Sequence, residues 1–159
     1  MKIHDKNSND TQRLVALWIA HFGSPVVVTR GRKVDPLALD GFVAEEEGKL
    51  LGAVTFIREG AEIEIVTLDG AVENRGVGTA LLDAVVARAR SEGLRRLFLV
   101  TTNDNIRAIR FYQKRGWDLV ALHRDAVVEA RKLKPQIPLT GDDGFPIRHE
   151  LEFELLLSP

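Results

Sequence analysis

Gly76 and Gly78 stand one residue apart where a helical pattern begins, and Arg75 precedes them. Glycine inside a helix costs about 0.5–1 kcal/mol relative to alanine, so these glycines need a compensating reason. The start of a helix leaves about four backbone N–H groups without partners in the helix, and the helix dipole adds partial positive charge there. Glycines at this point let phosphate oxygens approach the bare backbone. The stretch therefore indicates an anion cradle suited to a phosphate or a pyrophosphate.

Two common nucleotide-binding motifs do not fit this stretch. The P-loop pattern G-x-x-x-x-G-K-[S/T] occurs nowhere in the chain. The dinucleotide pattern G-x-G-x-x-G/A requires a small third residue, but the chain has Leu81 at that position. That pattern also belongs to a βαβ unit near the start of a fold, whereas antiparallel strands are expected before this stretch. A dinucleotide-binding oxidoreductase is therefore disfavoured. A helix whose first turn merely contains glycines is the structural alternative to a cradle.

The apolar residues on either side of the cradle predict the elements that position it. Short apolar runs separated by Glu-Gly pairs predict an antiparallel meander with strands near 42–46, 50–58 and 62–69. Leu81, Val85 and Ala89 recur every four residues and predict a helix from Gly78 to Gly93. The other expected elements are a first helix capped by Ser8, Asn9 or Asp10 and ending at Gly23, a buried strand at 95–102, a helix at 105–115 stopped by Gly116, and strands at 118–124 and 149–157.

The last of these strands alternates strictly. Leu151, Phe153 and Leu155 are expected in the core, and Glu150, Glu152 and Glu154 in solvent. Residues 125–148 connect the last two strands, with a short helix expected at 125–133. A connection of this length is uncommon and often functional.

Composition excludes several classes of protein. A chain of 159 residues predicts a single domain over 1–159, and 45% hydrophobic and 28% charged residues are ordinary for a soluble protein. The chain has no cysteine and a net charge of −1, so disulfides are excluded and a nucleic-acid partner is not favoured. No apolar stretch suits a membrane span or a signal peptide, so a cytoplasmic protein is expected. No metal site is expected either, because His21, His123 and His149 are widely spaced and read as surface or capping residues.

Two motifs carry a family resemblance. Arg75 to Ala80 matches [Q/R]-x-x-G-x-[G/A], and Asn-x-x-Ala-x-x-[aromatic or Leu]-Tyr is matched from Asn105 to Tyr112. Over roughly residues 10–124 the chain resembles the GNAT superfamily of acetyl-coenzyme A-dependent N-acetyltransferases. At 100° per residue, Asn105, Ala108, Ile109 and Tyr112 share one helix face.

The resemblance implies a mixed α/β fold with a central, mostly antiparallel sheet of six to seven strands flanked by helices. It also implies that strand 62–69 diverges from strand 97–102 and that acetyl-CoA, the co-substrate, lies in that gap. The residues that the resemblance implies for cofactor binding are Val66, Thr67, Leu68, Arg75, Gly76, Val77, Gly78, Thr79, Ala80, Asn105, Ala108 and Tyr112.

The implied reaction is direct attack of a primary amine on the thioester in a ternary complex. Tyr112 is the implied general acid toward the coenzyme A sulfur, and Glu64 the implied base. The structural alternatives are that Tyr112 is a core aromatic residue and that Glu62 and Glu64 coat a solvated face. A non-catalytic acetyl-CoA-binding sensor or interaction module is the alternative function.

The acceptor is expected to be a small-molecule or peptide amine, and the sequence leaves its identity open. Asp142 and Asp143 could attract a cationic amine, but "TGDDG" is more typical of a turn. The connection 125–148 is the part in which substrate choice transfers least from the resemblance. A homodimer is a further expectation, because dimers are common in such folds.

Overall fold

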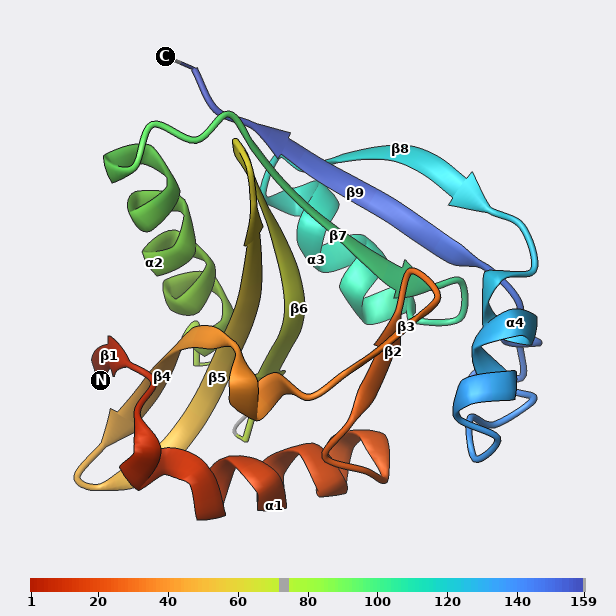
Figure 1. Cartoon of the computed structure of the whole chain (residues 1–159), viewed down its shortest axis with the longest axis horizontal. Coiled ribbons are helices and arrows are strands. Elements are labelled where there is room, and N and C mark those ends of the chain that lie inside the picture. The colour runs from red at the N-terminus through yellow and green to blue at the C-terminus, as the bar shows by residue number, and fades with distance from the viewer. Residues whose placement is uncertain (72–74, 159) are drawn as a thin grey trace. The chain divides into compact units, whose positions relative to one another are not determined.

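The computed structural model describes residues 1–71 and 75–158, and the chain divides into two compact units (Figure 1). The first unit contains residues 1–27 and 35–97 together with the chain end from Leu157. The second contains Val28–Val34 and Phe98–Leu156. Among the described residues, no helix is long and apolar enough to cross a membrane.

The first unit is an antiparallel meander. Its strands run in the order β1-β4-β5-β6, and each neighbouring pair is antiparallel. Their bounds are Lys2–Asp5 for β1, Asp40–Glu46 for β4, Lys49–Glu59 for β5 and Glu62–Gly70 for β6. The three strands predicted from the Glu-Gly punctuation are therefore confirmed, whereas β1, only four residues long, was not predicted.

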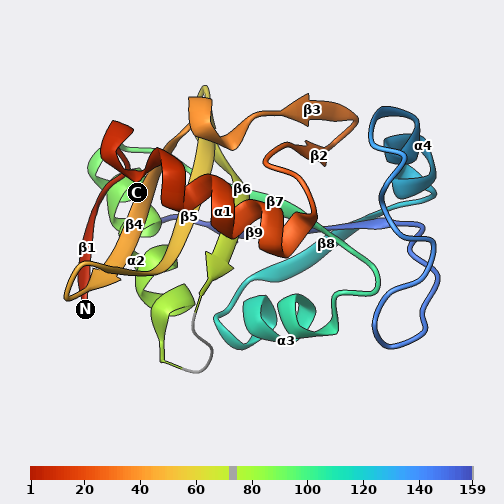
Figure 2. The same cartoon turned by 90° about the horizontal axis from the view of Figure 1, so that it is seen from below.

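Two helices cover opposite faces of this meander. In Figure 2, α1 (Thr11–Phe22) crosses in front of β5, and α2 (Val77–Ser91) lies beyond the strands. The α1 face is built from Leu14, Leu17, Trp18, Val43 and Ala53. Leu81, Val85 and Ala89 of α2 are fully buried, so the stripe predicted from their spacing is confirmed.

The starts and stops of α1 follow from local chemistry. A short 3₁₀ helix, η1 (Ser8–Asp10), precedes it, and Asn7 caps η1 by accepting a hydrogen bond from the Asn9 N–H. The predicted stop is confirmed, because Gly23 takes the left-handed conformation at φ 71°. A second 3₁₀ helix, η2 (Pro36–Ala38), leads into β4.

The second unit contains the strand order β7-β9-β8 and a separate β2-β3 pair. The bounds are Val27–Thr29 for β2, Arg32–Val34 for β3, Arg96–Thr102 for β7, Asp118–His123 for β8 and Glu150–Leu156 for β9. Its helices are α3 (Ile106–Lys114) and α4 (Ala126–Leu133). The fold class is thus confirmed: a mixed α/β fold with seven mostly antiparallel sheet strands and four described α-helices.

One alternation prediction in the second unit is partly wrong. Leu151 and Phe153 are buried as expected, but Glu150 is buried too. Its Oε2 accepts a hydrogen bond from the backbone N–H of Arg30, a residue of the loop that joins β2 to β3. That loop comes from a distant part of the sequence, so the pattern of β9 alone could not reveal it. The single-domain prediction stays a prediction.

A histidine–carboxylate pair joins α1 to β6. His21 Nδ1, in the last turn of α1, lies 3.3 Å from Oδ1 of the buried Asp69. The hydrogen bond to Asp69 raises the pKa of His21, and burial raises the pKa of Asp69. The indole of Trp18 lies close enough to lower the pKa of Asp69, although Trp18 Nε1 makes no hydrogen bond of good geometry to a described residue. Both net shifts mean that the folded state binds these protons more tightly than the unfolded chain does.

We therefore expect the unfolding temperature to fall as the pH rises from 6 to 9. The contribution of His21 is complete below its unfolded pKa of about 6.5 and is lost as the pH rises through its raised folded pKa. In Asp69→Asn, thermal unfolding followed by circular dichroism should show a smaller fall over this range. Asp142→Asn makes the same substitution at an exposed turn residue outside this pair and serves as the control. An Asp69→Asn profile identical to the parent would contradict the linkage.

Candidate functional site

The predicted anion cradle lies at the start of α2 in the first unit. Gly76 is the N-cap residue in the left-handed conformation, with φ 72° and ψ 14°, which glycine adopts without the Cβ penalty. A Cβ added to Gly76 would meet no atom of residues 1–71 or 75–158 within 4 Å, so these residues leave room beside the helix start. The first turn of α2 carries no acidic side chain. The first backbone N–H groups of this 15-residue helix have no partner within the helix, and the helix dipole places partial positive charge at the same end. Both features suit an anionic group.

Gly52 in β5 seats this helix start on the sheet. A Cβ added to Gly52 would lie 2.5 Å from the carbonyl oxygen of Asp69 and 2.8 Å from Cγ1 of Val77. Val77 is the first residue of α2, so the missing side chain lets the helix begin directly on the strand. Gly52 was not among the predicted site residues. Its signal was a glycine inside a strand pattern, which often marks a close approach.

Arg75 is engaged by an acidic neighbour. Its Nη2 lies 2.7 Å from Oε2 of Glu46, the last residue of β4, and the hydrogen bond lowers the pKa of Glu46. Both side chains are well exposed, and ion pairs between exposed groups contribute little to stability. Arg75 is therefore held beside the cradle by an interaction that a phosphate could replace.

A β-bulge interrupts β6 where the backbone was predicted to pair with the coenzyme. Thr55 of β5 lies opposite Thr67, and the next residue, Phe56, lies opposite Ile65, so Val66 has no partner in β5. The Thr55 and Thr67 hydroxyls are 2.6 Å apart and fully buried. A bulge re-aims the local backbone and side chains. Within the stretch Val66 to Leu68, for which backbone pairing with the coenzyme is predicted, Val66 is therefore the irregular residue, whereas Thr67 and Leu68 lie in register with β5.

Glu64 lies on the face of β6 that α1 covers. The register after the bulge places Glu64 opposite Ile57, on the same face as Thr67 and Asp69. Its side chain is 0% exposed, so the solvated-face alternative is wrong for Glu64. Glu62 is only half-buried and lies 3.7 Å from Arg96. The two glutamates therefore share a face but differ in environment.

Asn105 and Ala108 form the N-terminal cap of α3 in the second unit. The Asn105 side-chain oxygen accepts a hydrogen bond from the Ala108 N–H at 3.1 Å, and its Nδ2 donates to Thr101 Oγ1 at 3.3 Å. Asn105 therefore has a structural task, because capping stabilises a helix start. The sequence motif Asn-x-x-Ala coincides with this cap, so a coenzyme contact by Asn105 would act alongside capping.

Tyr112 is held in an aromatic cluster of the second unit. Its ring centroid lies 5.2 Å from Phe111, 5.4 Å from Trp117 and 5.9 Å from Phe153. With 6% of its surface exposed, Tyr112 is a packed residue as the core alternative describes. Packing fixes the ring and does not exclude a chemical role for the hydroxyl. It is the only tyrosine of the chain.

The remaining candidates are structural. His123 pairs with Glu152 at 2.9 Å, and His149 Nδ1 accepts the backbone N–H of Asp125. Across residues 1–71 and 75–158, no group of three or more His, Cys, Asp or Glu side chains could hold a metal ion. Asp142 and Asp143 lie in a turn closed by the Gly144 N–H and the Gly141 carbonyl at 3.0 Å, which confirms the turn.

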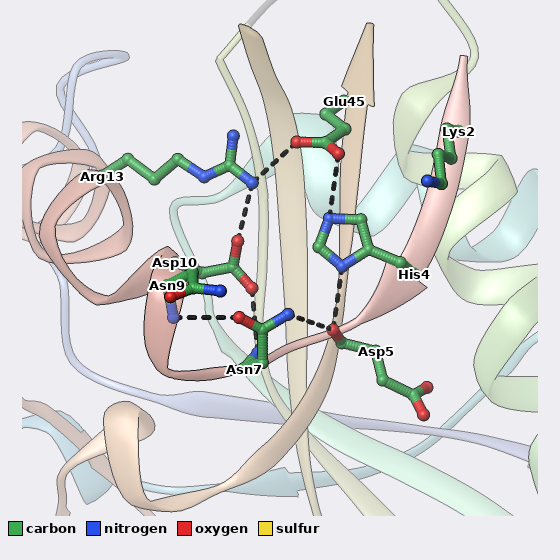
Figure 3. Close-up of a pocket in the computed structure, with 8 residues that line it drawn as sticks. All are labelled: Lys2, His4, Asp5, Asn7, Asn9, Asp10, Arg13 and Glu45. Carbon is green, nitrogen blue, oxygen red and sulfur yellow. Dashed lines mark hydrogen bonds and ion pairs between the residues drawn. The ribbon is translucent and has the colours of Figure 1, made fainter. Parts of the chain in front are cut away.

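A polar hollow of about 500 Å³ lies on the first unit, and none of the predicted site residues lines it (Figure 3). It is lined by Lys2, His4, Asp5, Asn7, Asn9, Asp10, Arg13 and Glu45. Arg13 Nη2 bridges Asp10 at 2.6 Å and Glu45 at 2.7 Å, and His4 lies 3.3 Å from Glu45. Burial raises the pKa of Asp10, but hydrogen bonds from Arg13 and the Asn7 backbone outweigh it and leave the pKa lowered. His4, Asp10, Arg13 and Glu45 pair with one another, so this network connects η1 and α1 to β4.

Known proteins resemble the chain along most of its length. The model of the acetyltransferase (GNAT) family matches residues 17–117. The uncharacterized protein YdhI of Bacillus subtilis (strain 168) is 39% identical over 159 residues, which cover 99% of each chain.

Solved structures agree in fold. An IAA acetyltransferase from Bacillus cereus ATCC 14579 has a TM-score of 0.76 at 17% identity, with 98% of this chain and 99% of that chain covered. A Bacillus subtilis acetyltransferase solved in complex with CoA has a TM-score of 0.72 at 17% identity, with 99% of both chains covered. At this identity the likeness concerns the fold alone. The family match spans more than half of the chain and includes both motifs. It gives the stronger conclusion: the chain belongs to the GNAT acetyltransferase family.

Proposed function

We propose that this protein transfers an acetyl group from acetyl-CoA to a primary amine by direct attack in a ternary complex. The observation that carries the proposal is the left-handed Gly76 cap, beside which the described residues leave room at the start of α2, after the bulged strand β6. This arrangement suits a pyrophosphate at the helix start and an extended arm along the irregular strand. The Bacillus subtilis neighbour solved with CoA supports the choice of ligand.

The first unit supplies the groups proposed for coenzyme binding and for the base. The N–H groups from Val77 to Ala80 and the guanidinium of Arg75 would hold the pyrophosphate, and Val66 to Leu68 would pair with the arm through their backbone. Glu64 would accept a proton from the acceptor ammonium, which must be neutral before it attacks. Burial of the Glu64 carboxyl suits this role, because a base works best away from bulk water.

The second unit supplies the proposed acid. When the amine nitrogen bonds to the thioester carbon, the C–S bond breaks and a thiolate leaves. The hydroxyl of Tyr112 would donate its proton to that sulfur, and Asn105 would hold the coenzyme or order nearby water. The ring contacts of Tyr112 restrict its rotamers, which is the pre-organisation a proton donor needs.

Replacing Gly78 by valine tests the cradle. The new side chain should block phosphate approach, so we expect at least a tenfold loss of acetyl-CoA affinity by isothermal titration calorimetry. Ala87→Val adds the same branched side chain at an exposed position of α2 and controls for helix propensity. Equal affinity in both variants would contradict the anion-cradle assignment.

Replacing Glu64 by glutamine tests the base. The substitution keeps the size of the side chain and removes its basicity, so the loss of turnover should be largest at low pH, where free amine is scarce. The matched control is Glu62→Gln, two residues away on the same strand face. Measured pH–rate profiles that coincide for parent and Glu64→Gln would leave the base unassigned.

Replacing Tyr112 by phenylalanine tests the acid and the reaction. A phenol has an ordinary pKa near 10 and is protonated at neutral pH. With a panel of primary amines and thiol release as the readout, turnover should fall by roughly 10²–10⁴-fold while acetyl-CoA affinity and unfolding temperature hardly change.

The control is Phe111→Leu, which alters the ring packing around Tyr112 and keeps the hydroxyl. Full activity in Tyr112→Phe removes Tyr112 from the mechanism. A large loss of stability instead makes Tyr112 a core residue. Acetyl-CoA binding without thiol release for any amine would favour the non-catalytic sensor.

A further inference from the structure

The buried face of α1 ends in a histidine. Leu14, Leu17 and Trp18 of this face form one apolar cluster with residues of β4 and β5. His21 lies three residues after Trp18, which is a spacing at which helix side chains share a face. An apolar residue would extend the packing there, but the chain has an imidazole whose side chain is 36% exposed. This end of α1 therefore combines contact with the sheet and contact with solvent.

A buried carboxylate of β6 holds this imidazole. Nδ1 of His21 lies 3.3 Å from Oδ1 of Asp69, whose side chain is only 5% exposed. Asp69 lies opposite Ala53, a member of the apolar cluster under α1, so its side chain points toward the helix. Its second oxygen, Oδ2, makes no hydrogen bond to any residue in 1–71 or 75–158. The described residues thus give this carboxylate one ion-pair partner, His21.

The other ring nitrogen of His21 is accessible to a ligand. Nε2 makes no hydrogen bond or ion pair with a residue that the structure describes. A carboxylate that accepts the Nδ1–H leaves a lone pair on Nε2, and it stabilises the imidazolium that forms when Nε2 takes a proton. The hydrogen bond to Asp69 raises the pKa of His21, and no other charged group of the described residues contributes to this shift. The pair therefore has the composition of a proton acceptor.

This pair adjoins the stretch of β6 to which the proposed function assigns the coenzyme arm. Asp69 directly follows Val66 to Leu68, and its side chain lies on the same strand face as that of Glu64. Glu64, the proposed base, has no exposed surface, whereas the His21 side chain contacts solvent. Of these two groups, His21 is the one that can pass a proton directly to water.

The proton balance of the proposed reaction requires more than one acceptor. The nitrogen of a primary ammonium loses two protons when it becomes the N–H of an amide. As the N–C bond forms, the C–S bond breaks, and the thiolate takes a proton from Tyr112. One of the two protons from nitrogen then restores Tyr112, and the other is released to solvent. A single carboxylate takes up one proton at a time, so a second acceptor completes the balance.

We propose that His21 is this second acceptor, whose Nε2 takes one of the two protons from the acceptor nitrogen and releases it to water. Asp69 is the positioning residue that orients the ring. The inference rests on the proposed function, in which Glu64 takes the other proton. The same pair also links α1 to β6, but a purely stabilising role leaves the turnover of the folded enzyme unchanged.

Turnover of His21→Gln tests the acceptor. With a saturating primary amine and the acetylated amine as the readout, kcat should fall by roughly 10²-fold, whereas acetyl-CoA affinity by calorimetry should stay at the parent value. His4→Gln is the matched control, because His4 also lies 3.3 Å from a carboxylate of the first unit, that of Glu45. It should keep the parent turnover.

Two outcomes of this experiment separate the inference from the proposed function. Parent turnover in His21→Gln overturns the inference and leaves the proposed function standing, because the enzyme still acetylates amines. A parent enzyme that binds acetyl-CoA but acetylates no amine overturns both.

Chemical rescue separates proton transfer from stability. His21→Ala leaves room beside Asp69 for free imidazole, so added imidazole should raise the rate of amine acetylation until it saturates. His4→Ala is the control, and its rate should not respond to imidazole. A His21→Ala enzyme that imidazole does not accelerate overturns the assignment of the proton to His21.

The pH profile of kcat tests the positioning role of Asp69. His21 accepts a proton only when it is neutral, so kcat of the parent should rise as the pH passes its raised pKa. Asp69→Asn removes the interaction that raises this pKa, so the rising limb should move to lower pH and reach a lower plateau. Asp40→Asn, at an exposed residue of the first unit, is the control and should keep the parent profile. A rising limb of Asp69→Asn at the parent position overturns the role of Asp69.

Discussion

The seating of α2 on the backbone of β5 is the contact on which the candidate site depends. Gly52 has no side chain, and the first residue of α2, Val77, occupies the space that a Cβ would need. The helix start is thereby fixed against the strand pair β5-β6, whose register continues to the bulge at Val66. A packed interior moves little, so this contact transmits the position of the strands to the N–H groups at the helix start.

The face of β6 toward α1 combines burial with polarity. Glu64, Thr67 and Asp69 are all buried there, where the Thr67 hydroxyl contacts Thr55 and the Asp69 carboxylate contacts His21. Buried polar groups are costly unless they are paired, so such a row persists only where hydrogen bonds satisfy it or function uses it. Asp69 illustrates the cost, because burial raises its pKa and its Oδ2 makes no hydrogen bond to a described residue.

The motif residues proposed for the chemistry also have structural tasks. Asn105 caps α3 through the Ala108 N–H, and Tyr112 packs among three aromatic rings. A residue that is already fixed by packing or capping loses little further entropy when it takes part in chemistry. The same positions can therefore be read from the sequence both as helix signals and as candidate site residues.

The sequence by itself determined the elements whose signals are local. The meander, the stripe of α2, the stop at Gly23 and the turn at 141–144 follow from periodicity and turn chemistry, and the two motifs indicated the family. Only the tertiary structure decided which polar residues are buried and where strands bulge. Glu64 and Glu150 look like solvated residues in an alternating pattern, yet other segments cover them. Burial and register depend on contacts between residues far apart in sequence, and no local pattern encodes those contacts.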